Sequence, residues 1–296
     1  MNIAVNPAKV PALPIEKSTG YWKTVGQRFM RDRVAVFAAF VILLLIAMAL
    51  FGSYIAPYDP FASSIMKRLK PIGFTGHILG TDELGRDMLS RLIVGTKLSL
   101  FMGITPVVNA FVIGSVIGII AGYAGGTINT VIMRTIDVFY AFPSVLLAIA
   151  LSGVLGAGIT NSLISLTIVF IPPIARVAES VTTQIRTRDY VDAARASGAN
   201  AFTIVRVHVL GNVLGPIFVY ATSLIAVSMI LASGLSFLGL GVKPPEPEWG
   251  LMLNTLRTAI YVQPWIAALP GVMIFVTSIA FNLLSDGLRT AMEIKN

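Results

Sequence analysis

Polar side chains that could do chemistry are concentrated in one stretch of this apolar chain, residues 189–212, which carries Asp192, Arg195 and His208. A carboxylate and a guanidinium three residues apart can pair with opposite charges on another protein. His208 is one of only two histidines, and the sequence shows no paired carboxylates, nucleophile with a base, or metal-ligand cluster beside it. The stretch therefore predicts protein recognition, and we expect the chain not to be an enzyme.

A second cluster of charges contains Asp82, Glu83, Arg86, Asp87 and Arg91. It nearly matches the phosphate-binding loop Gly-x-x-x-x-Gly-Lys-Ser/Thr, but Arg86 stands at the lysine position and Asp87 at the hydroxyl position, so we expect no ATP binding. The carboxylates could hold a metal ion, yet they lack support from histidine. Pairing with the two arginines is the favoured interpretation, and no cofactor is expected on this chain.

The composition indicates a membrane protein with several spans. Of the 296 residues, 55% are hydrophobic and 12% are charged, which is too apolar for a soluble domain of this length. Lys and Arg give a formal net charge of +8, but they sit in the connections between apolar runs, where lipid headgroups account for them. The expected partner is thus the lipid bilayer and no nucleic acid. Cysteine is absent, so the chain cannot form disulfides.

Charge-free apolar stretches predict six transmembrane helices and therefore an all-α membrane protein. Their ranges are Val34–Ala56, Leu98–Tyr123, Ile136–Leu155, Asn161–Ile174, Val213–Leu240 and Trp265–Leu284. Pro172 and Pro173 interrupt the fourth, which we expect to run on to about Ala178, because a membrane helix tolerates prolines where neighbouring groups satisfy the freed carbonyls. The first apolar run begins too late for a signal peptide and predicts an uncleaved helix.

The distribution of Lys and Arg predicts that both termini lie in the cytoplasm, because these residues are more frequent in the connections on the side of the N-terminus. The resulting segments are a cytoplasmic N-terminal segment 1–33, a first transmembrane helix 34–56, an external segment 57–97, a core 98–288 with the cytoplasmic loop 179–212, and a cytoplasmic tail 289–296. Trp22, Val25 and Phe29 share a face at helical spacing and predict a short helix in the plane of the headgroups.

The polar stretch has the local signals of two short helices. Ala193 and Ala194 favour a helix and leave a smooth surface that a partner can approach closely. Gly198 can end that helix in a left-handed conformation. Asn200 can then cap a second helix over Ala201–Val207. Two short helices joined at an angle predict a stiff unit between two spans.

The same stretch resembles the EAA loop of ABC-importer permeases, whose pattern is Glu-Ala-Ala, three residues, Gly, nine residues, then an apolar residue, any residue and Leu-Pro. Here the sequence Asp192-Ala193-Ala194 is followed at that spacing by Gly198 and then by His208-Val209-Leu210-Gly211. Asp192 stands where Glu is usual, and Gly211 stands where Pro is usual.

Other segments are similar to signatures of the dipeptide, oligopeptide and nickel permeases, in the subunit type called DppC or OppC. They are Leu79–Leu92, Ala56–Pro60, Leu235–Gly241, Pro247–Gly250 and Phe281–Arg289. Ser285 replaces the glycine that is more usual in the last of them. The resemblance covers nearly the whole chain after residue 20, but it does not specify the cargo.

This resemblance implies a MetI-like type I ABC importer permease fold with a cytoplasmic coupling helix that sits in a groove of an ATPase subunit. The residues expected to couple to the ATPase are Asp192, Ala193, Ala194, Arg195, Gly198, Ala199 and His208. The implied partners in the bacterial inner membrane are a second homologous permease, two ATP-binding cassette subunits or domains that bind ATP and magnesium, and an extracytoplasmic solute-binding protein. The residues expected at the outer mouth, where that protein docks, are Asp82, Glu83, Arg86 and Asp87.

The transported solute is expected to be a dipeptide, an oligopeptide or a related small solute, with nickel chelates, glutathione and opines as open alternatives. A self-contained channel or secondary carrier is an alternative of a different class. The later spans hold few ionisable residues, since Asp137 and Asp286 lie near span ends, and this disfavours a proton-coupled carrier. Gly114, Gly118 and Gly122, at four-residue spacing, predict close packing of two helices.

Overall fold

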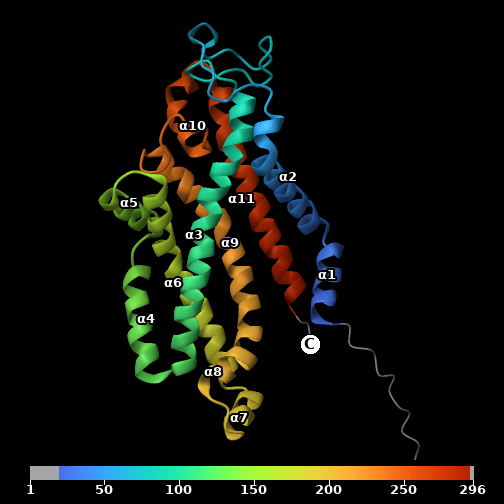
Figure 1. Ribbon diagram of the computed structural model, residues 1–296, viewed down its shortest axis with the longest axis vertical. Helices are drawn as coiled ribbons and strands as arrows, with labels where there is room; N and C mark the ends of the chain where they lie inside the picture. Colours follow the sequence, from blue (N-terminus) through green and yellow to red (C-terminus); the bar gives the residue numbers. More distant parts are fainter. Residues whose placement is uncertain (1–19, 294–296) are drawn as a thin grey trace, which may run out of the picture.

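The chain folds into an elongated bundle of helices, which a computed structural model describes for residues 20–293 (Figure 1). The α-helices are α1 Tyr21–Arg31, α2 Arg33–Ile55, α3 Met88–Ala124, α4 Gly126–Tyr140, α5 Ser144–Leu155, α6 Ile159–Arg186, α7 Asp189–Ala196, α8 Ala201–Ile204, α9 Leu210–Phe237, α10 Trp249–Thr255 and α11 Pro264–Met292. No β-strand forms among the described residues, and the all-α prediction is confirmed. Residues 1–19 of the predicted N-terminal segment and 294–296 of the predicted tail lie outside the described residues.

Five helices are long and apolar enough to cross a membrane, and α4 with α5 would make a sixth span if the bent pair crosses as one. The prediction of one unbroken helix over Ile136–Leu155 is wrong, because α4 ends at Tyr140, α5 begins at Ser144, and the pair is bent by 86°. Pro143 explains the break, since it offers no N–H to a helix and disfavours the helical conformation of the residue before it.

The second span starts earlier than predicted, because α3 begins at Met88 and not at Leu98. The carboxylate of Asp87 caps this helix by accepting a hydrogen bond from the Ser90 N–H at 2.8 Å. Arg91 is buried in the first turn, with polar partners described below. A charge-free run is therefore too strict a criterion for a helix whose end is covered by other parts of the protein.

Three further helices run beyond the predicted spans, among them α11, which continues past Leu284 to Met292. α6 continues through both prolines to Arg186, past the expected end near Ala178. The expected separate helix over Ala201–Val207 is wrong, because α8 continues through a π-helical segment, Val205–Val209, directly into α9. The second half of the polar stretch is thus the first part of a long membrane helix.

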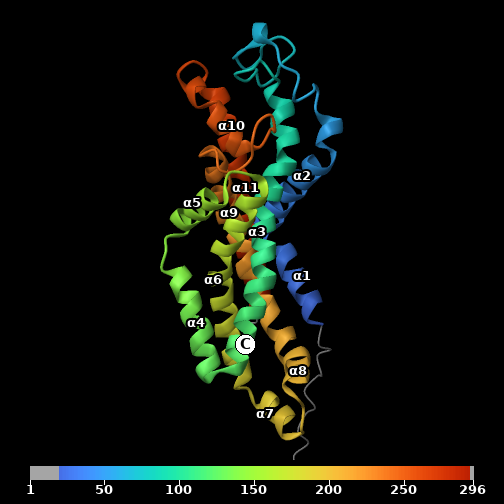
Figure 2. The ribbon, with the colours of Figure 1, turned by 60° about the vertical axis from the view of Figure 1, so that its left-hand side comes forward.

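α3 lies at the centre of the bundle and packs against α2, α6 and α9 (Figures 1 and 2). The glycine ridge of α3 faces the backbone of α6. A Cβ atom at Gly122 would lie 2.7 Å from the carbonyl oxygen of Glu179, and one at Gly118 would overlap the carbonyl oxygen of Ala175. The predicted close packing is confirmed, because only glycine lets the two backbones approach so closely.

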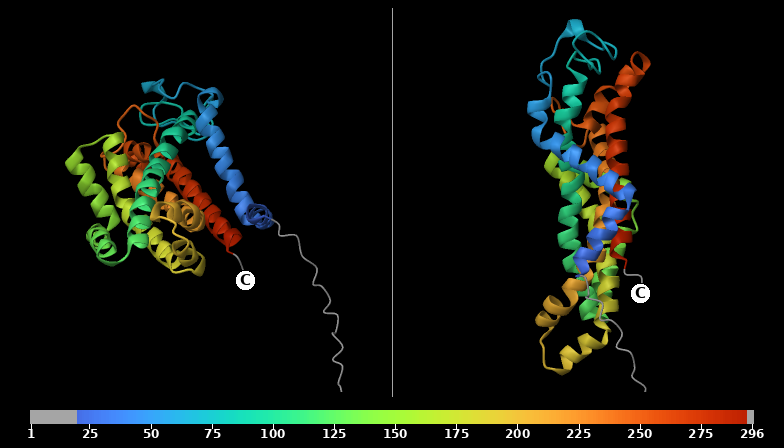
Figure 3. Two further views of the ribbon diagram at one scale, coloured as in Figure 1. Left: turned by 60° about the horizontal axis from the view of Figure 1, so that its bottom comes forward. Right: turned by 90° about the vertical axis from the view of Figure 1, so that its right-hand side faces the viewer.

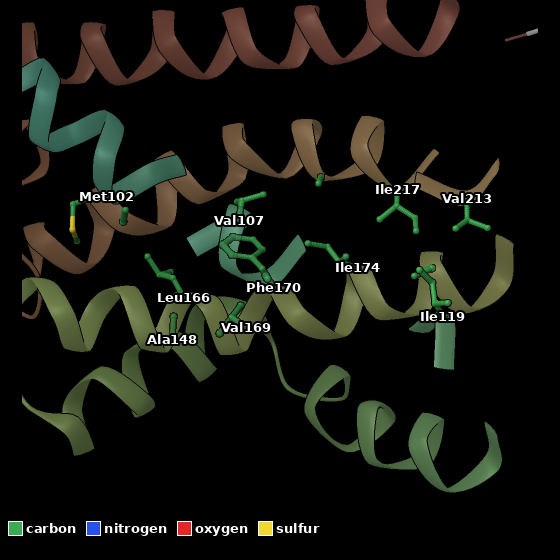
Figure 4. Packing of buried hydrophobic residues seen from close by; sticks show 14 of the residues in the cluster. Met102, Val107, Ile119, Ala148, Leu166, Val169, Phe170, Ile174, Val213 and Ile217 are labelled. Carbon is green, nitrogen blue, oxygen red and sulfur yellow. The ribbon is translucent and has the colours of Figure 1, made fainter. Parts of the chain in front are cut away.

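Larger side chains fill the space between α3, α6 and α9. Phe170 of α6 and Val107 of α3 are buried beside one another, and Ile217 of α9 lies in the same cluster (Figure 4). Protein interiors are close-packed and resist deformation. We therefore treat the three helices as one mechanical unit.

The two ends of the bundle differ (Figure 3). α7 and α8 form one end, named here the α7 end, and α10 with residues 57–87 forms the other, the α10 end. α1 and the C-terminal part of α11 lie in the half of the bundle nearer the α7 end. α1 forms where the short N-terminal helix is predicted, although Val25 turns toward the protein and is buried while Trp22 is exposed.

Candidate functional site

α7 lies across the end of the bundle between α6 and α8 (Figure 2). Asp189 and Asp192 stand in its first turn and Arg195 in its last. Acidic residues at the start and a basic residue at the end of a helix interact favourably with its dipole. Val191 points inward, is fully buried and belongs to the same hydrophobic cluster as Phe170. The apolar side of α7 therefore anchors the helix to the bundle, and its polar side faces outward.

The C-terminal end of α7 is closed by a Schellman motif, a pair of backbone hydrogen bonds around a left-handed residue. The Ala199 N–H donates to the Ala194 carbonyl at 3.1 Å, and the Gly198 N–H donates to the Arg195 carbonyl at 3.0 Å. Gly198 has φ +83°, so the predicted left-handed turn is confirmed. These bonds fix the turn from α7 toward α8, and at Gly198 itself no atom lies within 4 Å of where a Cβ would be.

α8 begins with a side-chain cap. The Oδ1 atom of Asn200 accepts a hydrogen bond from the Thr203 N–H at 2.8 Å, which confirms the predicted capping role. Ile204 and Val209 are buried in the central cluster and extend the anchored side of the stretch. Because α8 runs on into α9, a force on this region reaches a membrane helix without crossing a flexible link. We call residues 187–209 the α7 loop.

The charged pair of the α7 loop is open to solvent. Arg195 Nη1 donates to Asp192 Oδ1 at 2.8 Å, with the two side chains 41% and 63% exposed. The guanidinium also lies 5.8 Å from the centre of the Tyr123 ring at the end of α3. An exposed ion pair of this kind stabilises a protein by only about 0–1 kcal/mol. Asp192 can therefore exchange its partner for a cation on another protein.

His208 is part of the support behind this surface. Its ring is tilted against that of Tyr190 with centroids 6.2 Å apart, and its carbonyl accepts a hydrogen bond from Asn212 Nδ2 at 2.7 Å. The contact links the π-helical segment to α7. His208, predicted to couple to the ATPase, therefore supports the surface from behind.

The structure brings the predicted coupling residues together at one end of the bundle but divides them between two roles. The exposed members are Asp192, Ala193, Arg195 and Gly198, and the half-buried members are Ala194, Ala199 and His208. Ala194 and Ala199 pack against the central cluster. The first group can touch a partner, whereas the second positions it.

Phe202 is a surface residue that the sequence reasoning missed. It stands in the first turn of α8 and is 74% exposed, although it belongs to a helix whose neighbour Ile204 is buried. The signal in the sequence is an aromatic residue two positions after the N-cap of a polar loop. Exposed aromatic side chains of this kind are frequent anchors of protein interfaces.

The charge cluster of residues 82–91 lies at the α10 end, and the predicted pairing with arginines is present. Asp82 Oδ2 lies 2.6 Å from Arg86 Nε and 3.2 Å from Arg91 Nε, and Glu83 pairs with Arg86 at 3.0 Å. Asp82, Arg86 and Arg91 are at most 5% exposed. Among the described residues no group of three or more His, Asp or Glu side chains is arranged to hold a metal ion.

Asp87 makes a second buried network at the same end. Its Oδ1 atom lies 2.9 Å from His77 Nδ1, and its Oδ2 atom accepts from the Ser90 hydroxyl at 2.7 Å. Lys67 Nζ lies 3.3 Å from His77 Nε2. Three of the four predicted docking residues, Asp82, Arg86 and Asp87, are thus buried, so a role in docking would consist of shaping the surface above them.

Glu248 and Trp249 belong to the signature segment Pro247–Gly250, and both fix α10 in place, a role that was not predicted. The carboxylate of Glu248 caps α10 by accepting from the N–H groups of Gly250 and Leu251, both at 2.8 Å. Burial raises the pKa of the Glu248 carboxyl, although these hydrogen bonds oppose the shift. Trp249 is fully buried and donates from Nε1 to the Leu92 carbonyl at 3.1 Å, which fixes α10 to α3.

In the part of the chain that the structure describes, three cavities open along one side of α9. Their volumes are about 420, 300 and 430 Å³. Tyr220 lines the first two, and Val227 lines the second and third. The side of α9 that carries these residues is therefore hollowed from the level of α11's C-terminal end to the middle of the bundle.

The comparisons with known proteins agree with this architecture. Residues 114–295 match the family described as binding-protein-dependent transport system inner membrane component, and residues 20–71 match the N-terminal TM domain of oligopeptide transport permease C. The chain is 41% identical over 288 residues to the glutathione transport system permease protein GsiD of Pectobacterium atrosepticum, covering 97% of this chain and 96% of that protein. It is 42% identical over 274 residues to GsiD of Shigella boydii, covering 93% of this chain and 90% of that protein.

Among solved structures, the chain is similar to the MetNI methionine ABC transporter in an inward-facing conformation, with a TM-score of 0.57 and 19% identity over 69% of this chain and 97% of that chain. This likeness shows a shared MetI-like type I permease fold. Taken with the sequence matches, it shows that the chain belongs to the family of binding-protein-dependent transport system inner membrane components and is a multi-pass permease subunit of an ABC importer, in the oligopeptide, dipeptide and glutathione branch.

Proposed function

We propose that this permease works with a second homologous permease and two ATP-binding cassette subunits or domains. In this proposal an ATPase subunit binds the permease at the α7 loop. The observation that carries the proposal is how the loop is attached. Val191 anchors α7 in the bundle core, the Schellman motif fixes the turn, and α8 is continuous with α9. A segment attached in this way can transmit a displacement, whereas a flexible connection would absorb it.

The proposed mechanism moves several helices as one body. The partner subunits bind ATP and magnesium and close on each other, which displaces the groove that holds α7. The displacement pulls on α6 and α9, and these helices move with α3 because the three share a close-packed core. The permease then changes between inward-open and outward-open packing, as in rigid-body transitions generally.

The outward side of the α7 loop defines the chemistry of the ATPase groove. Asp192 requires a basic residue, and Phe202 requires an apolar pocket. Ala193, beside Asp192, is small and exposed, so that the partner can approach the helix backbone there. Arg195 holds Asp192 in place before docking and offers a second charge once docked.

We propose that the α7 end faces the cytoplasm of a bacterial cell and that both termini lie there. α1 and the end of α11 lie in the half of the bundle nearer α7, which supports this orientation (Figure 1). The α10 end would then face the solute-binding protein outside the membrane. Its exposed residues Ile65, Met66 and Leu84 are candidates for contact, with Asp82 and Asp87 as buried supports.

The proposed cargo is a short peptide, and glutathione is the peptide named for the relatives. Nickel chelates and opines are the alternatives. The hollowed side of α9 supports a pathway between two permeases, since one chain supplies only one wall of it.

The experiment that tests the coupling role compares Gly198→Val with Gly211→Val. Both glycines have open space where a Cβ would be added, but only Gly198 has a positive φ. A β-branched residue at Gly198 therefore distorts the turn without any steric overlap. We expect Gly198→Val to lower both transport and transport-stimulated ATP hydrolysis in the purified assembly while the chain still inserts into the membrane.

Gly211→Val should leave both activities close to those of the unchanged protein. Normal coupled transport in the Gly198→Val protein would contradict the assigned role of the loop. Transport without ATP by this chain alone in liposomes would instead support a self-contained channel or carrier.

A further inference from the structure

An ion pair joins α4 and α6 on the surface of the bundle. Arg176 Nη2 contacts Asp137 Oδ1, and Arg134 Nη1 lies 3.8 Å from Asp137 Oδ2. The side chains of Arg176 and Asp137 are 48% and 36% exposed. The three groups together carry one net positive charge. Glu179, one turn further along α6, accepts from Asn129 and Thr183 instead and takes no part in this contact.

The pair lies on the side of the bundle, far from the nearer ends of α4 and α6. Arg176 precedes the last residue of α6, Arg186, by ten positions, and a rise of 1.5 Å per residue places it about 15 Å from that end. Asp137 follows the first residue of α4, Gly126, by eleven positions, which gives a similar height of about 16 Å. Ionisable side chains on a membrane helix are costly where they contact lipid, so this face requires water or protein beside it.

The helices are interrupted beside the pair. α4 and α5 are bent by 86° directly after Tyr140, and α6 carries two prolines at the same level. Pro172 and Pro173 supply no N–H to the carbonyls of Ile168 and Val169. Broken helices inside a membrane protein are tolerated where they are buried in protein or line a water-filled cavity.

A cavity of about 300 Å³ opens at this break. Its lining includes Phe139, Tyr140, Phe142, Pro172, Pro173 and Tyr220. Tyr140 connects the cavity to the ion pair, because the Arg176 guanidinium lies 5.3 Å from the centre of its ring. A charged group, an aromatic wall and a cavity that could hold a small molecule are therefore contiguous.

We propose that Arg176, Asp137 and Tyr140 form a contact site for the carboxylate end of the transported peptide on its way through the membrane. This inference rests on the proposed function, because it takes the hollowed side of α9 as one wall of the pathway. Asp137 pairs with only some of the N–H groups of the Arg176 guanidinium, and the remaining N–H groups can bind a carboxylate. Asp137 keeps capacity for a ligand ammonium group, and the aromatic wall can hold an apolar or thiol-bearing side chain.

When Arg134, which also pairs with Asp137, is counted with the site, the groups carry one net positive charge, which favours a solute with a net negative charge. Glutathione has two carboxylates and one ammonium group and therefore fits this balance at neutral pH, whereas a simple zwitterionic tripeptide is electrically neutral. Exposure also argues for a binding role. Tyr140 and Phe142 beside the pair are exposed as well, so a solute can reach the charged groups and the aromatic wall together.

The test measures uptake by cells in which the chromosomal copy of this chain carries Arg176→Gln. Uptake by a strain that lacks the chain is subtracted as background. Two probe pairs are used: glutathione with its glycyl monoethyl ester, and trialanine with its C-terminal amide. Removing one partner of a charged hydrogen bond lowers binding by roughly tenfold or more. We expect uptake of the free acids to fall about tenfold. Uptake of the ester and the amide should change less, because their blocked carboxyl groups do not pair with the guanidinium, so the ratio of free-acid uptake to blocked-form uptake should fall.

Since the solute-binding protein is unchanged, the shift in this ratio isolates the contribution of the permease. A second variant exchanges the pair, Arg176→Asp with Asp137→Arg, and would restore a merely structural ion pair. We expect that exchange not to restore uptake of the acid. The ATPase should co-purify with both altered chains, which would show that the variants fold and assemble.

An unaltered ratio in Arg176→Gln, or full recovery in the exchanged pair, would overturn the proposal. So would failure of the unchanged cells to take up either free acid through this system. Failure of the proposed function would look different: no ATPase would co-purify with this chain, or uptake would not require ATP, whatever residue 176 is.

Discussion

The two ends of this permease hold their charged residues in opposite ways. At the α7 end, Asp192 and Arg195 pair in solvent and the shape of the loop comes from backbone caps around Gly198. At the α10 end, Asp82 and Arg91 pair in the interior and the shape comes from side chains that hold one another. Charges that are buried fix a surface, whereas charges that remain exposed are available to a partner.

This difference assigns different consequences to the same kind of substitution. Loss of a charge at the α10 end leaves other charges buried without partners and should reduce stability. Loss of a charge or an aromatic group at the α7 end should leave stability almost unchanged and reduce association with the ATPase.

The largest effect is expected from Asp82→Asn. The change removes the carboxylate that pairs with buried Arg91 and leaves Arg86 with Glu83 alone, and breaking a buried ion pair typically lowers the free energy of unfolding by about 3–5 kcal/mol. Thermal unfolding of the detergent-purified chain measures this. The matched control is Glu83→Gln, whose carboxylate is less buried and for which a loss below about 1 kcal/mol is expected. Equal losses in the two variants would remove the contrast between the ends.

Gly118→Val tests the unit that connects the two ends. The added side chain overlaps the α6 backbone at Ala175, and overpacking of this kind costs about 1–3 kcal/mol or more. Gly153→Val in α5, where nothing lies within 4 Å of an added Cβ, is the control and should be nearly neutral. If Gly118→Val kept full stability and transport, α3 and α6 would not need to move together.

Phe202→Ala sharpens the comparison at the α7 end. Because the side chain is largely exposed, we expect the free energy of unfolding to change by about 0.5 kcal/mol or less. Association with the ATPase should weaken by about 2 kcal/mol, as for the loss of an interface anchor. Co-purification of the ATPase at rising detergent concentration measures this, with Val207→Ala as an exposed control one turn away. Equal retention in the two variants would exclude Phe202 as an anchor.

The smallest effect concerns the pH dependence of stability through Glu248. Its pKa is raised in the folded protein above the ordinary value of 4.5, so the folded state holds this proton more tightly than the unfolded state. The resulting contribution to stability is present below pH 4.5 and is lost as the pH rises through the folded pKa. Glu248→Gln should lose about 1 kcal/mol from one missing cap hydrogen bond and should melt with a weaker dependence on pH. An unchanged pH dependence would show that Glu248 does not titrate in this range.

Local signals in the sequence predict local structure well. The turn at Gly198, the cap at Asn200 and the glycine ridge of α3 all follow from residue types at short spacing, and the structure has each of them. The resemblance to importer permeases likewise gives the fold correctly. These features depend on a few neighbouring residues, and for that reason a single sequence contains enough information.

Features that depend on distant segments escape prediction. The early start of α3 requires Asp82 to cover Arg91, and the charge-free criterion cannot see a partner on another segment. The break between α4 and α5 lies within a continuous apolar run, in which Pro143 is the one residue that indicates it. Asp137 stands near the end of a predicted span, and only the packing of α4 against α6 shows its contact with Arg176. Phe202 escapes prediction because an aromatic residue in a loop does not reveal its own exposure.

The central claim is that the α7 loop touches an ATPase subunit, and site-directed cross-linking tests it most directly. The chain has no cysteine, so a single Cys at the exposed Ala196 of α7 can be compared with one at the exposed Met66 of the α10 end. In the native membrane we expect Ala196→Cys to cross-link to an ATP-binding subunit in a yield that changes with nucleotide, and Met66→Cys not to do so. Cross-linking of the ATPase from Met66→Cys but not from Ala196→Cys would contradict both the assigned orientation and the coupling role of the loop.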